Sequence, residues 1–447
     1  MRELLLVSRN FAPTSHVSVE RAIKLAKYLP EFGWQPTVLA GVASPGLPED
    51  PALLEQVGGI EVLRPRAPEF SLFYGDRGRR SRRSGGAAGG VLSQRGAPRR
   101  GMFHPKSWLI PDSQVLWYPF AVRAALRLAA GRRAPHWDAV VATSFPPTAL
   151  LIGHTLARRL GIPYVADFRD SWTRFPNAPV RPPPLAALER RLERRMVRDA
   201  AAVVAVDAAT VTHVFDALDP ARRPPLYVIQ NGYDEEDFHR VVPAPLPRFS
   251  IVHTGQLRRS PAPLWAALAE AMRLRPSLIG SLHVWQVGFV APEAVGGLQA
   301  APEGVTVHVV PPVPQREAVA YMLGADLLLV EEYRGIMPSK TLQYLRAGRP
   351  ILGLLDEGRL IREVLGDAPE GHAVRREDKE RAGGIVALLA GRPRGAPRPP
   401  DAAVAAYSRR EVAARYASLL DTACARSASA TLPEREVGPP RAARPGG

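Results

Sequence analysis

Short apolar runs alternate with helix-period segments along the first half of the chain. Strand-like runs cover residues 4–8, 36–40, 139–142, 164–166 and 202–206. Apolar residues recur at helical spacing between them, which predicts helices at residues 19–28, 148–160 and 185–198. Strands of continuous Val, Ala and Leu that alternate with helices predict a parallel sheet covered on both faces.

The same alternation restarts after a Pro-rich stretch near residue 245. Strand-like runs follow at residues 250–253, 282–287, 305–310, 325–330 and 351–355. At 447 residues the chain exceeds the size at which a single hydrophobic core stops growing. We therefore predict an α/β protein with two doubly wound, Rossmann-like domains, at residues 1–240 and 248–420.

Three segments depart from this pattern. Residues 76–101 are rich in Gly, Arg and Ser, so we expect a disordered basic insert within the first domain. Residues 421–447 are expected to form a disordered tail. Residues 102–130 mix aromatic residues such as Trp108 and Phe120 with cations. That mixture fits a membrane interface, and it fits core packing or the wall of a substrate pocket at least as well.

The formal net charge is +16, but its distribution argues against nucleic acid as a partner. Residues 77–101 carry eight Arg and no acid, and residues 392–447 carry ten Arg against five acids. No zinc-finger, homeodomain or RNA-binding signature accompanies these segments. An anionic membrane surface fits a tethered basic loop better.

The single cysteine, Cys424, excludes a disulfide framework and a Cys-based metal site, in agreement with a reducing compartment. The opening apolar run at residues 4–7 is too short for a signal-peptide core. No apolar run approaches the ~20 residues of a membrane-spanning helix. We expect a cytoplasmic protein, either soluble or peripheral on the inner face of the cell membrane.

A predicted helix start with a lysine follows the strand at residues 325–330. Pro338 stands at the expected first helical position, Ser339 and Lys340 come next, and a Gly-Arg-Pro run at residues 348–350 ends the helix. Backbone N–H groups and the helix dipole attract phosphate there, and Lys340 adds a positive charge. The stretch allows two interpretations, an anion site or an ordinary crossover with a solvated lysine.

Two arginines, Arg258 and Arg259, follow the strand that ends at residues 253–255. Gly255 permits close approach of a ligand to the backbone, and guanidinium groups recognise diphosphates through paired hydrogen bonds. A phosphate role is the favoured interpretation, with solvation of either arginine as the alternative.

In the first domain a predicted strand ends in Asp167, Arg169 and Asp170. Two carboxylates and an arginine at a strand end can act as a base, hold an acceptor or form a charge-paired scaffold. We favour a functional role, because such a cluster is costly as scaffolding alone. His16, in the loop after the first strand, lies at the same rim, although a lone histidine there is more often solvent-facing than catalytic.

Several common catalytic motifs are absent from the sequence. There is no Gly-x-Gly-x-x-Gly run, no Walker A run, no Gly-x-Ser-x-Gly elbow, and no His-x-x-x-His or Asp-x-Asp metal pair. These absences leave metal-free stabilisation of a departing diphosphate by cationic side chains, without a cofactor.

Four stretches, taken in order, resemble the GT-B glycosyltransferases of family 4, especially the bacterial members that build surface polysaccharides. They are residues 167–172, residues 228–238, residues 253–255 and residues 339–351. The resemblance spans about residues 1–370 without the insert. It implies GT-B architecture, with two Rossmann-like domains facing a central cleft, and retaining transfer of a sugar from a nucleotide-diphosphate donor to a lipid-linked or polysaccharide acceptor.

By this resemblance the C-terminal domain holds the donor and the N-terminal domain holds the acceptor. The candidate catalytic residues are Asp167, Asp170, Arg258 and Lys340; the candidate donor-binding residues are Gly255, Arg259, Pro338, Ser339 and Gln343; those on the acceptor side are His16, Arg169 and Asn231. No residue is assigned to a metal.

The chain departs from the family pattern in two places. Residues 15–18 stand where the family usually has Gly-Gly, and Gln343 stands where it usually has an acidic residue that binds the donor ribose. The family's earlier glutamate falls at Gly335, with Glu331 and Glu332 nearby. A glutamine can still hydrogen-bond a ribose hydroxyl, without charge-assisted strength. The alternatives are a degenerate assembly partner of an active transferase and a nucleotide-sugar epimerase of the same architecture, whose ring of carboxylates and His we cannot place here.

Overall fold

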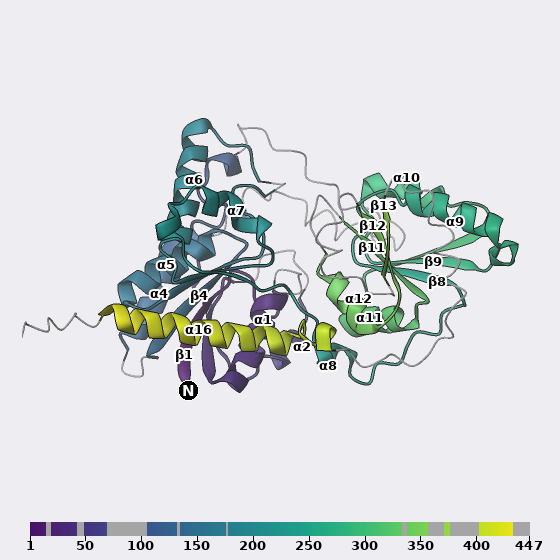
Figure 1. Ribbon diagram of the computed structural model, residues 1–447. Coiled ribbons are helices and arrows are strands. Elements are labelled where there is room, and N and C mark those ends of the chain that lie inside the picture. Colours follow the sequence, from purple (N-terminus) through teal and green to yellow (C-terminus); the bar gives the residue numbers. More distant parts are fainter. Residues whose placement is uncertain are drawn as a thin grey trace, which may run out of the picture.

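The structure, a computed structural model, describes residues 1–14, 19–42, 49–68, 105–131, 135–175, 178–332, 338–355, 371–375 and 402–431. The described strands form two parallel sheets in two α/β domains (Figure 1). The predicted fold class, two doubly wound domains, is confirmed. The basic insert at residues 76–101 lies outside the described residues.

The N-terminal sheet has the order β3-β2-β1-β4-β5-β6-β7. Its strands are β1 (Arg2–Val7), β2 (Trp34–Leu39), β3 (Glu61–Leu63), β4 (Trp137–Ser144), β5 (Tyr164–Phe168), β6 (Ala202–Ala205) and β7 (Leu226–Val228). The helices of this half of the chain are α1 (Glu20–Tyr28), α2 (Ala52–Glu55), α4 (Trp117–Ala129), α5 (Thr148–Leu160), α6 (Pro183–Arg198), α7 (Ala209–Asp216) and α8 (Glu235–Phe238), with 3-10 turns η1 (Leu29–Phe32), η3 (Pro105–Trp108) and η4 (Pro220–Arg222).

Helices cover both faces of this sheet. Successive strand residues point to opposite faces, so Leu4 and Leu6 pack with α1 while Leu5 and Val7 pack with α4 and α5. Both faces of β1 are therefore buried, which explains why its sequence is continuously apolar rather than alternating.

The C-terminal sheet has the order β10-β9-β8-β11-β12-β13. Its strands are β8 (Ser250–Thr254), β9 (Leu282–Val287), β10 (Val305–Val310), β11 (Leu327–Glu331), β12 (Ile351–Leu355) and β13 (Gly371–Arg375). The helices of this half are α9 (Ala262–Leu274), α10 (Pro292–Gln299), α11 (Gln315–Gly324), α12 (Lys340–Ala347), α15 (Ala402–Ala405) and α16 (Arg409–Thr431), with the 3-10 turn η5 (Pro276–Leu278). Leu327 and Leu329 of β11 pack with α9 and α10, and Leu328 and Val330 pack with α11 and α12.

The last helix, α16, belongs to the N-terminal domain. Figure 1 shows it in yellow, lying beside α1, and Val412, Tyr416 and Leu420 are part of the apolar core that contains Leu4. The predicted limit of the C-terminal domain at residue 420 is therefore wrong, and the predicted tail is helical as far as Thr431. Sequence order alone does not reveal that an amphipathic segment at the end of the chain fills a gap over the first sheet.

The chain passes from the first domain to the second near Tyr233 and returns near Tyr407, and these two segments are hydrogen-bonded to each other. The N–H of Tyr233 donates to the carbonyl of Tyr407 at 3.1 Å, and the N–H of Arg409 donates to the carbonyl of Tyr233 at 2.7 Å. A Cβ at Gly232 would lie 2.3 Å from the carbonyl oxygen of Tyr407, so only glycine permits this approach. Residues 231–234, within the stretch 228–238 that resembles the family, are thus the point where the outgoing and returning chain segments meet.

The aromatic segment before and within α4 divides between core and surface. Trp117 and Ala121 are buried in the N-terminal core, whereas Trp108 and Phe120 are exposed. Core packing is therefore the role of one face of α4. None of the described helices is both long enough and apolar enough to cross a membrane.

Candidate functional site

The candidate donor residues surround the start of α12, where β8 and β11 end side by side. The N–H of Thr254 donates to the phenol oxygen of Tyr344 at 2.8 Å, which ties α12 to the end of β8. The N–H of Arg258 donates to the Glu331 carboxylate at 2.9 Å, which ties the next loop to the end of β11. These two bonds hold the loop after β8 next to α12.

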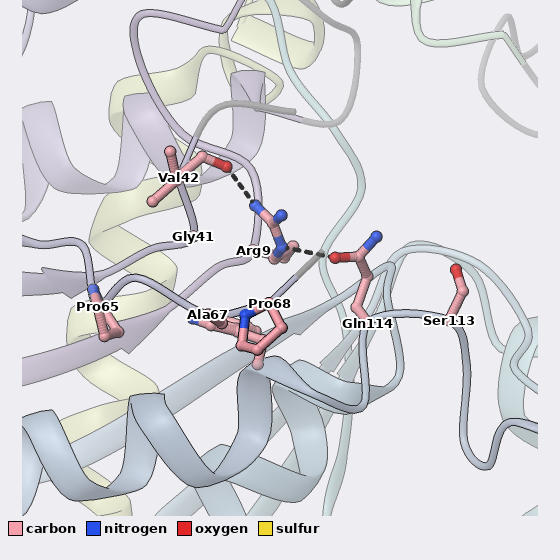
Figure 2. Close-up of a pocket in the computed structure, with 9 residues that line it drawn as sticks. Arg9, Gly41, Val42, Pro65, Ala67, Pro68, Ser113 and Gln114 are labelled. Carbon is pink, nitrogen blue, oxygen red and sulfur yellow. Dashed lines mark hydrogen bonds between the residues drawn. The ribbon is translucent and has the colours of Figure 1, made fainter. Parts of the chain in front are cut away.

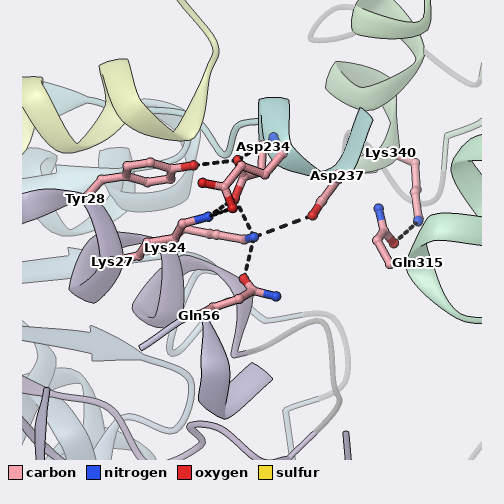
Figure 3. A network of polar contacts seen from close by, with 9 residues as sticks. Lys24, Lys27, Tyr28, Gln56, Asp234, Asp237, Gln315 and Lys340 are labelled. Atoms are coloured by element: carbon pink, nitrogen blue, oxygen red, sulfur yellow. Dashed lines mark hydrogen bonds and ion pairs between the residues drawn. The ribbon is translucent and has the colours of Figure 1, made fainter. Parts of the chain in front are cut away.

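A set of polar groups at α12, here called the α12 cluster, consists of Gln315, Lys340, Thr341 and Gln343. The Nζ of Lys340 donates to Gln315 Oε1 at 3.2 Å (Figure 3). Within the described part of the chain, Gln315 Nε2, Thr341 Oγ1 and Gln343 Oε1 are buried without a hydrogen-bond partner. Each such group costs about 1–3 kcal/mol unless a ligand satisfies it. The cluster therefore has the character of a polar ligand site.

Lys340 is partly buried, and burial lowers its pKa. The charges of Glu20 and Asp237 oppose that shift. An anion bound beside Nζ would raise the pKa again, because it favours the ammonium form. Lys340 is thus placed to respond to a phosphate group.

His253, at the end of β8, is a neutral imidazole at physiological pH. Burial lowers its pKa to about 4, the charge of Lys340 acts in the same direction, and the hydrogen bond with Gln286 opposes both. Its Nδ1 lies 2.7 Å from Gln286 Oε1, so a neutral ring that donates from Nδ1 presents Nε2 as an acceptor. The sequence pointed to His253 only as part of a family motif.

The other donor-side candidates lie on the loops around this cluster. Gly255 has φ +114°, a left-handed conformation that favours glycine, and Gln286 Nε2 donates to its carbonyl at 2.9 Å. Arg258 is exposed and Arg259 partly exposed.

Pro338 precedes α12 instead of starting it. The helix begins at Lys340, with Ser339 at the N-cap position and without a side-chain capping bond. The N–H of Thr341 donates to the carbonyl of Pro338 at 3.0 Å. The predicted start of the helix at Pro338 is thus two residues early.

Asp167, on the acceptor side, is completely buried at the end of β5. The Nε–H of Arg21 donates to its carboxylate at 3.1 Å. Arg21 also donates to the carbonyl of Ile229 at 2.9 Å and to the phenol of Tyr416 at 2.7 Å. The pair ties α1, β5, the end of β7 and α16 together, which is the scaffold role that the sequence left as an alternative.

Arg169, Asp170 and Asn231 lie at the same edge of the N-terminal sheet. Burial raises the pKa of Asp170, the charge of Arg169 opposes that shift and Asp207 adds to it. Asn231 Oδ1 accepts a long hydrogen bond, 3.4 Å, from Arg21. The structure thus brings Arg169, Asp170 and Asn231 into one region, and His16 lies outside the described residues.

A network around Asp234 joins the N-terminal domain to the start of α8 (Figure 3). Lys24 Nζ and the Tyr28 hydroxyl contact the Asp234 carboxylate at 2.5 and 2.6 Å, and Lys27 Nζ lies at 3.3 Å. Burial alone would raise the pKa of Asp234, but these three groups hold it at about 2. Asp237 lies 3.6 Å from Lys24 Nζ and also attracts Lys340, so the network borders the α12 cluster.

A small pocket lies beyond the ends of β1 and β2 (Figure 2). Arg9 crosses it, donating to the carbonyl of Val42 at 2.7 Å and to Gln114 Oε1 at 3.0 Å. Its guanidinium carbon is 5.8 Å from the centre of the Trp117 ring. Arg9 was not predicted as a pocket residue, because a single arginine after a strand is usually solvated.

No group of three or more His, Cys, Asp or Glu that could hold a metal ion occurs among the residues that the structure describes.

Comparisons with known proteins give a family match over part of the chain and a fold for nearly all of it. Residues 19–232 match the family described as "Glycosyl transferase 4-like domain". No curated protein matches the chain by sequence.

Solved structures resemble the chain over nearly its whole length. Sucrose-phosphate synthase from Thermosynechococcus elongatus is 13% identical with a TM-score of 0.60, and covers 95% of this chain and 100% of its own. HepE from Anabaena, in complex with UDP and glucose, is 16% identical with a TM-score of 0.53, over 97% and 100%. The lipopolysaccharide outer core galactosyltransferase WaaB is 11% identical with a TM-score of 0.54, over 94% and 99%. At these identities the likeness shows the fold, which is GT-B as the sequence predicted.

Proposed function

We propose, from the premise that this chain is a GT-B glycosyltransferase with a glycosyl transferase 4-like domain at residues 19–232, that it is a retaining hexosyltransferase. It moves a sugar from a nucleotide-diphosphate donor to a lipid-linked or polysaccharide acceptor. The α12 cluster carries the proposal, because its buried polar atoms lack partners at the strand ends where doubly wound domains bind ligands.

In the proposed reaction the bond between the anomeric carbon and the diphosphate oxygen breaks. The acceptor hydroxyl oxygen forms its bond on the same face of the sugar, and its proton is lost. Negative charge grows on the departing diphosphate, where Lys340 and one of Arg258 and Arg259 neutralise it. The HepE structure holds UDP and glucose, a ligand pair of the class proposed here.

The side chains of the α12 cluster have different proposed tasks. Gln343 offers a buried carbonyl oxygen to a ribose hydroxyl. Lys340 and Gln315 meet phosphate oxygens, and the neutral His253 adds an acceptor without a charge that would oppose Lys340. No metal is required, because the cations of the chain supply the positive charge.

On the acceptor side, Asp170 is the proposed proton acceptor and Asp167 acts through Arg21. Asp170 is partly exposed and burial raises its pKa, which suits a group that takes up a proton. Asp167 has no exposed surface and contacts Arg21, so its task is to position the strand end.

The acceptor side is proposed to meet an anionic membrane at the inner face of the cell membrane. Phe120, Arg123 and Arg127 of α4 are exposed and share one helical face by their spacing. An aromatic residue with two arginines on one face suits the headgroup region of a bilayer. A lipid-linked acceptor would be met at that surface.

The proposed function is tested with the full chain and a panel of nucleotide-diphosphate sugars. We expect the nucleotide diphosphate to be released only when an acceptor is present. The new glycosidic linkage is expected to have the same anomeric configuration as the donor. Donor binding without release would favour the degenerate assembly partner, and interconversion of the free nucleotide sugar would favour the epimerase. No binding and no release with any donor would contradict the proposal.

A further inference from the structure

Arg409, the first residue of α16, is a buried arginine with no counter-ion in ion-pair contact among the residues that the structure describes. Only 6% of its surface is exposed. Its Nη1 is buried and has no hydrogen-bond partner, and no ion pair of its guanidinium occurs among the described residues. Leaving a buried charged group in this state costs several kcal/mol. The absence of a partner therefore indicates that a ligand completes the site.

The fold holds Arg409 in place through its backbone. Its N–H donates to the carbonyl of Tyr233 at 2.7 Å, in the segment that Gly232 allows to approach. Ser408 then accepts the N–H of Glu411 at its Oγ, 3.2 Å away, and so caps the helix. The position of the guanidinium thus follows from the crossing of the two chain segments rather than from a side-chain partner.

Arg410, the next residue along α16, is in a different environment from Arg409. Arg410 is exposed and its Nε lies 2.6 Å from the Glu31 carboxylate, an ordinary surface ion pair. The two arginines are adjacent on one helix, yet within the described part of the chain Arg410 forms an ion pair and Arg409 does not.

Charged groups of both signs surround Arg409. Burial lowers its pKa to about 10, the charges of Arg21 and Arg169 act in the same direction, and Glu20 and Asp234 oppose it. Arg409 still carries its charge at neutral pH. Asp234 is already engaged by Lys24, Lys27 and Tyr28, so Glu20 is the remaining acid among these neighbours.

We propose that Arg409, with Arg169 beside it, forms an anion subsite that binds a phosphate group of the acceptor. The assignment to the acceptor rests on the proposed function, and on the place of both arginines in the half of the site built on the N-terminal domain. A guanidinium matches phosphate oxygens through paired charge-assisted hydrogen bonds. The acceptor class is then a phosphorylated sugar or a lipid phosphate, and the phosphate is the shared recognition element.

Binding of inorganic phosphate to the full chain, measured by isothermal titration calorimetry, tests the subsite without any requirement for turnover. Arg409→Gln is expected to weaken phosphate binding about tenfold or more, the loss of one strong charge-assisted pair. Arg410→Gln, the matched control, is expected to leave it unchanged. Glu20→Gln is expected to strengthen it, because a repelling carboxylate is removed. Equal phosphate binding by wild type, Arg409→Gln and Arg410→Gln would overturn the subsite.

Thermal unfolding separates a ligand-binding arginine from a structural one. Arg409→Met removes an uncompensated buried charge, so its melting temperature without phosphate is expected to equal or exceed that of the wild type. Phosphate is expected to stabilise the wild type and not this variant. A lower melting temperature of Arg409→Met, with an unchanged response to phosphate, would mean that Arg409 only supports the fold.

Titration with UDP assigns the phosphate to acceptor or donor. If Arg409 serves the acceptor, Arg409→Gln binds UDP as the wild type does, while Lys340→Met binds it more weakly. Loss of UDP binding in Arg409→Gln would place the donor diphosphate at Arg409 and refute the acceptor assignment. Competition by a soluble sugar phosphate, compared with vesicles that contain a lipid phosphate, then identifies the source. Each of these readouts stands even if no sugar transfer is found.

Discussion

Arg21 and Asp167 form an ion pair of 3.1 Å in which the two side chains are 1% and 0% exposed. The pair joins helix α1 to strand β5, an interior strand of the N-terminal sheet, and Arg21 extends the connection to Tyr416 of the returning helix. Asp167 is the last residue but one of the strand that the sequence placed at the cleft, but its carboxylate contacts Arg21 inside the domain.

We expect Asp167→Asn to destabilise the protein by about 3–5 kcal/mol, because it leaves the charge of Arg21 buried and uncompensated. Urea unfolding followed by circular dichroism measures the loss. The double variant Arg21→Met, Asp167→Leu should recover most of the stability, since it removes both charges together. A stable Asp167→Asn variant without turnover would instead return Asp167 to a direct role in catalysis.

Lys340→Met should lower turnover about 100-fold, or roughly 3 kcal/mol in the activation free energy, because it removes a cation from the departing diphosphate. Arg273→Gln is the control, since Arg273 is an exposed cation on α9 that is paired with Glu270. Nucleotide release is measured for both variants, with and without a chelator. Full activity of Lys340→Met, or loss of wild-type activity in the chelator, would contradict metal-free stabilisation by Lys340.

Gly232→Ala should destabilise the protein by about 1–3 kcal/mol, because the new Cβ meets the carbonyl oxygen of Tyr407 at 2.3 Å. Gly296→Ala in α10 is the control. Nothing lies within 4 Å of a Cβ there, so this change should be neutral or stabilising by up to about 1 kcal/mol. The denaturant midpoints of Gly232→Ala and Gly296→Ala are compared. Equal midpoints would show that the two crossing segments can move apart without a loss of folding free energy.

His253 should make the fold less stable as the pH falls from 6.5 towards 4. The pKa of about 4 in the folded protein lies below the ordinary histidine pKa of 6.5, so between these values the unfolded chain binds a proton that the native protein does not. The loss amounts to about 3 kcal/mol across the window. His253→Gln should flatten this part of the stability profile, measured by urea unfolding at several pH values. An unchanged slope in the variant would mean that His253 is protonated in the folded protein.

The exposed face of α4 should contribute to binding of anionic vesicles. Each arginine near such a surface adds at most ~1 kcal/mol, so Arg123→Gln with Arg127→Gln should weaken binding roughly tenfold, and salt should release the wild type. Arg158→Gln with Arg159→Gln, two exposed arginines of α5, is the control pair. Binding is measured by sedimentation with anionic and with neutral vesicles. A variant that lacks residues 77–101 tests the contribution of the basic insert in the same assay. Equal, salt-independent binding to both vesicle types would rule out an electrostatic contact.

Local patterns were sufficient for most of the strands and for a helix start close to Lys340. Continuous apolar runs such as residues 4–8 predict buried parallel strands, because a strand covered on both faces has no polar side. The edge strands β3, β7 and β13 were not predicted, since short strands with mixed composition carry little periodic signal. The lysine after Pro338 was recognisable because helix starts have a local chemical signature.

The sequence by itself determined the class of the fold, the order of its strands and helices, and the loops in which site residues occur, because each of these depends on neighbours along the chain. Only the tertiary structure decided that Asp167 meets Arg21, that α16 returns to the first domain and that Arg409 Nη1 is buried without a hydrogen-bond partner among the described residues. Those outcomes depend on contacts between residues far apart in sequence. The sequence around a charged residue is the same whether or not its side chain forms an ion pair. The pairing depends on which other segment of the chain packs against that side chain.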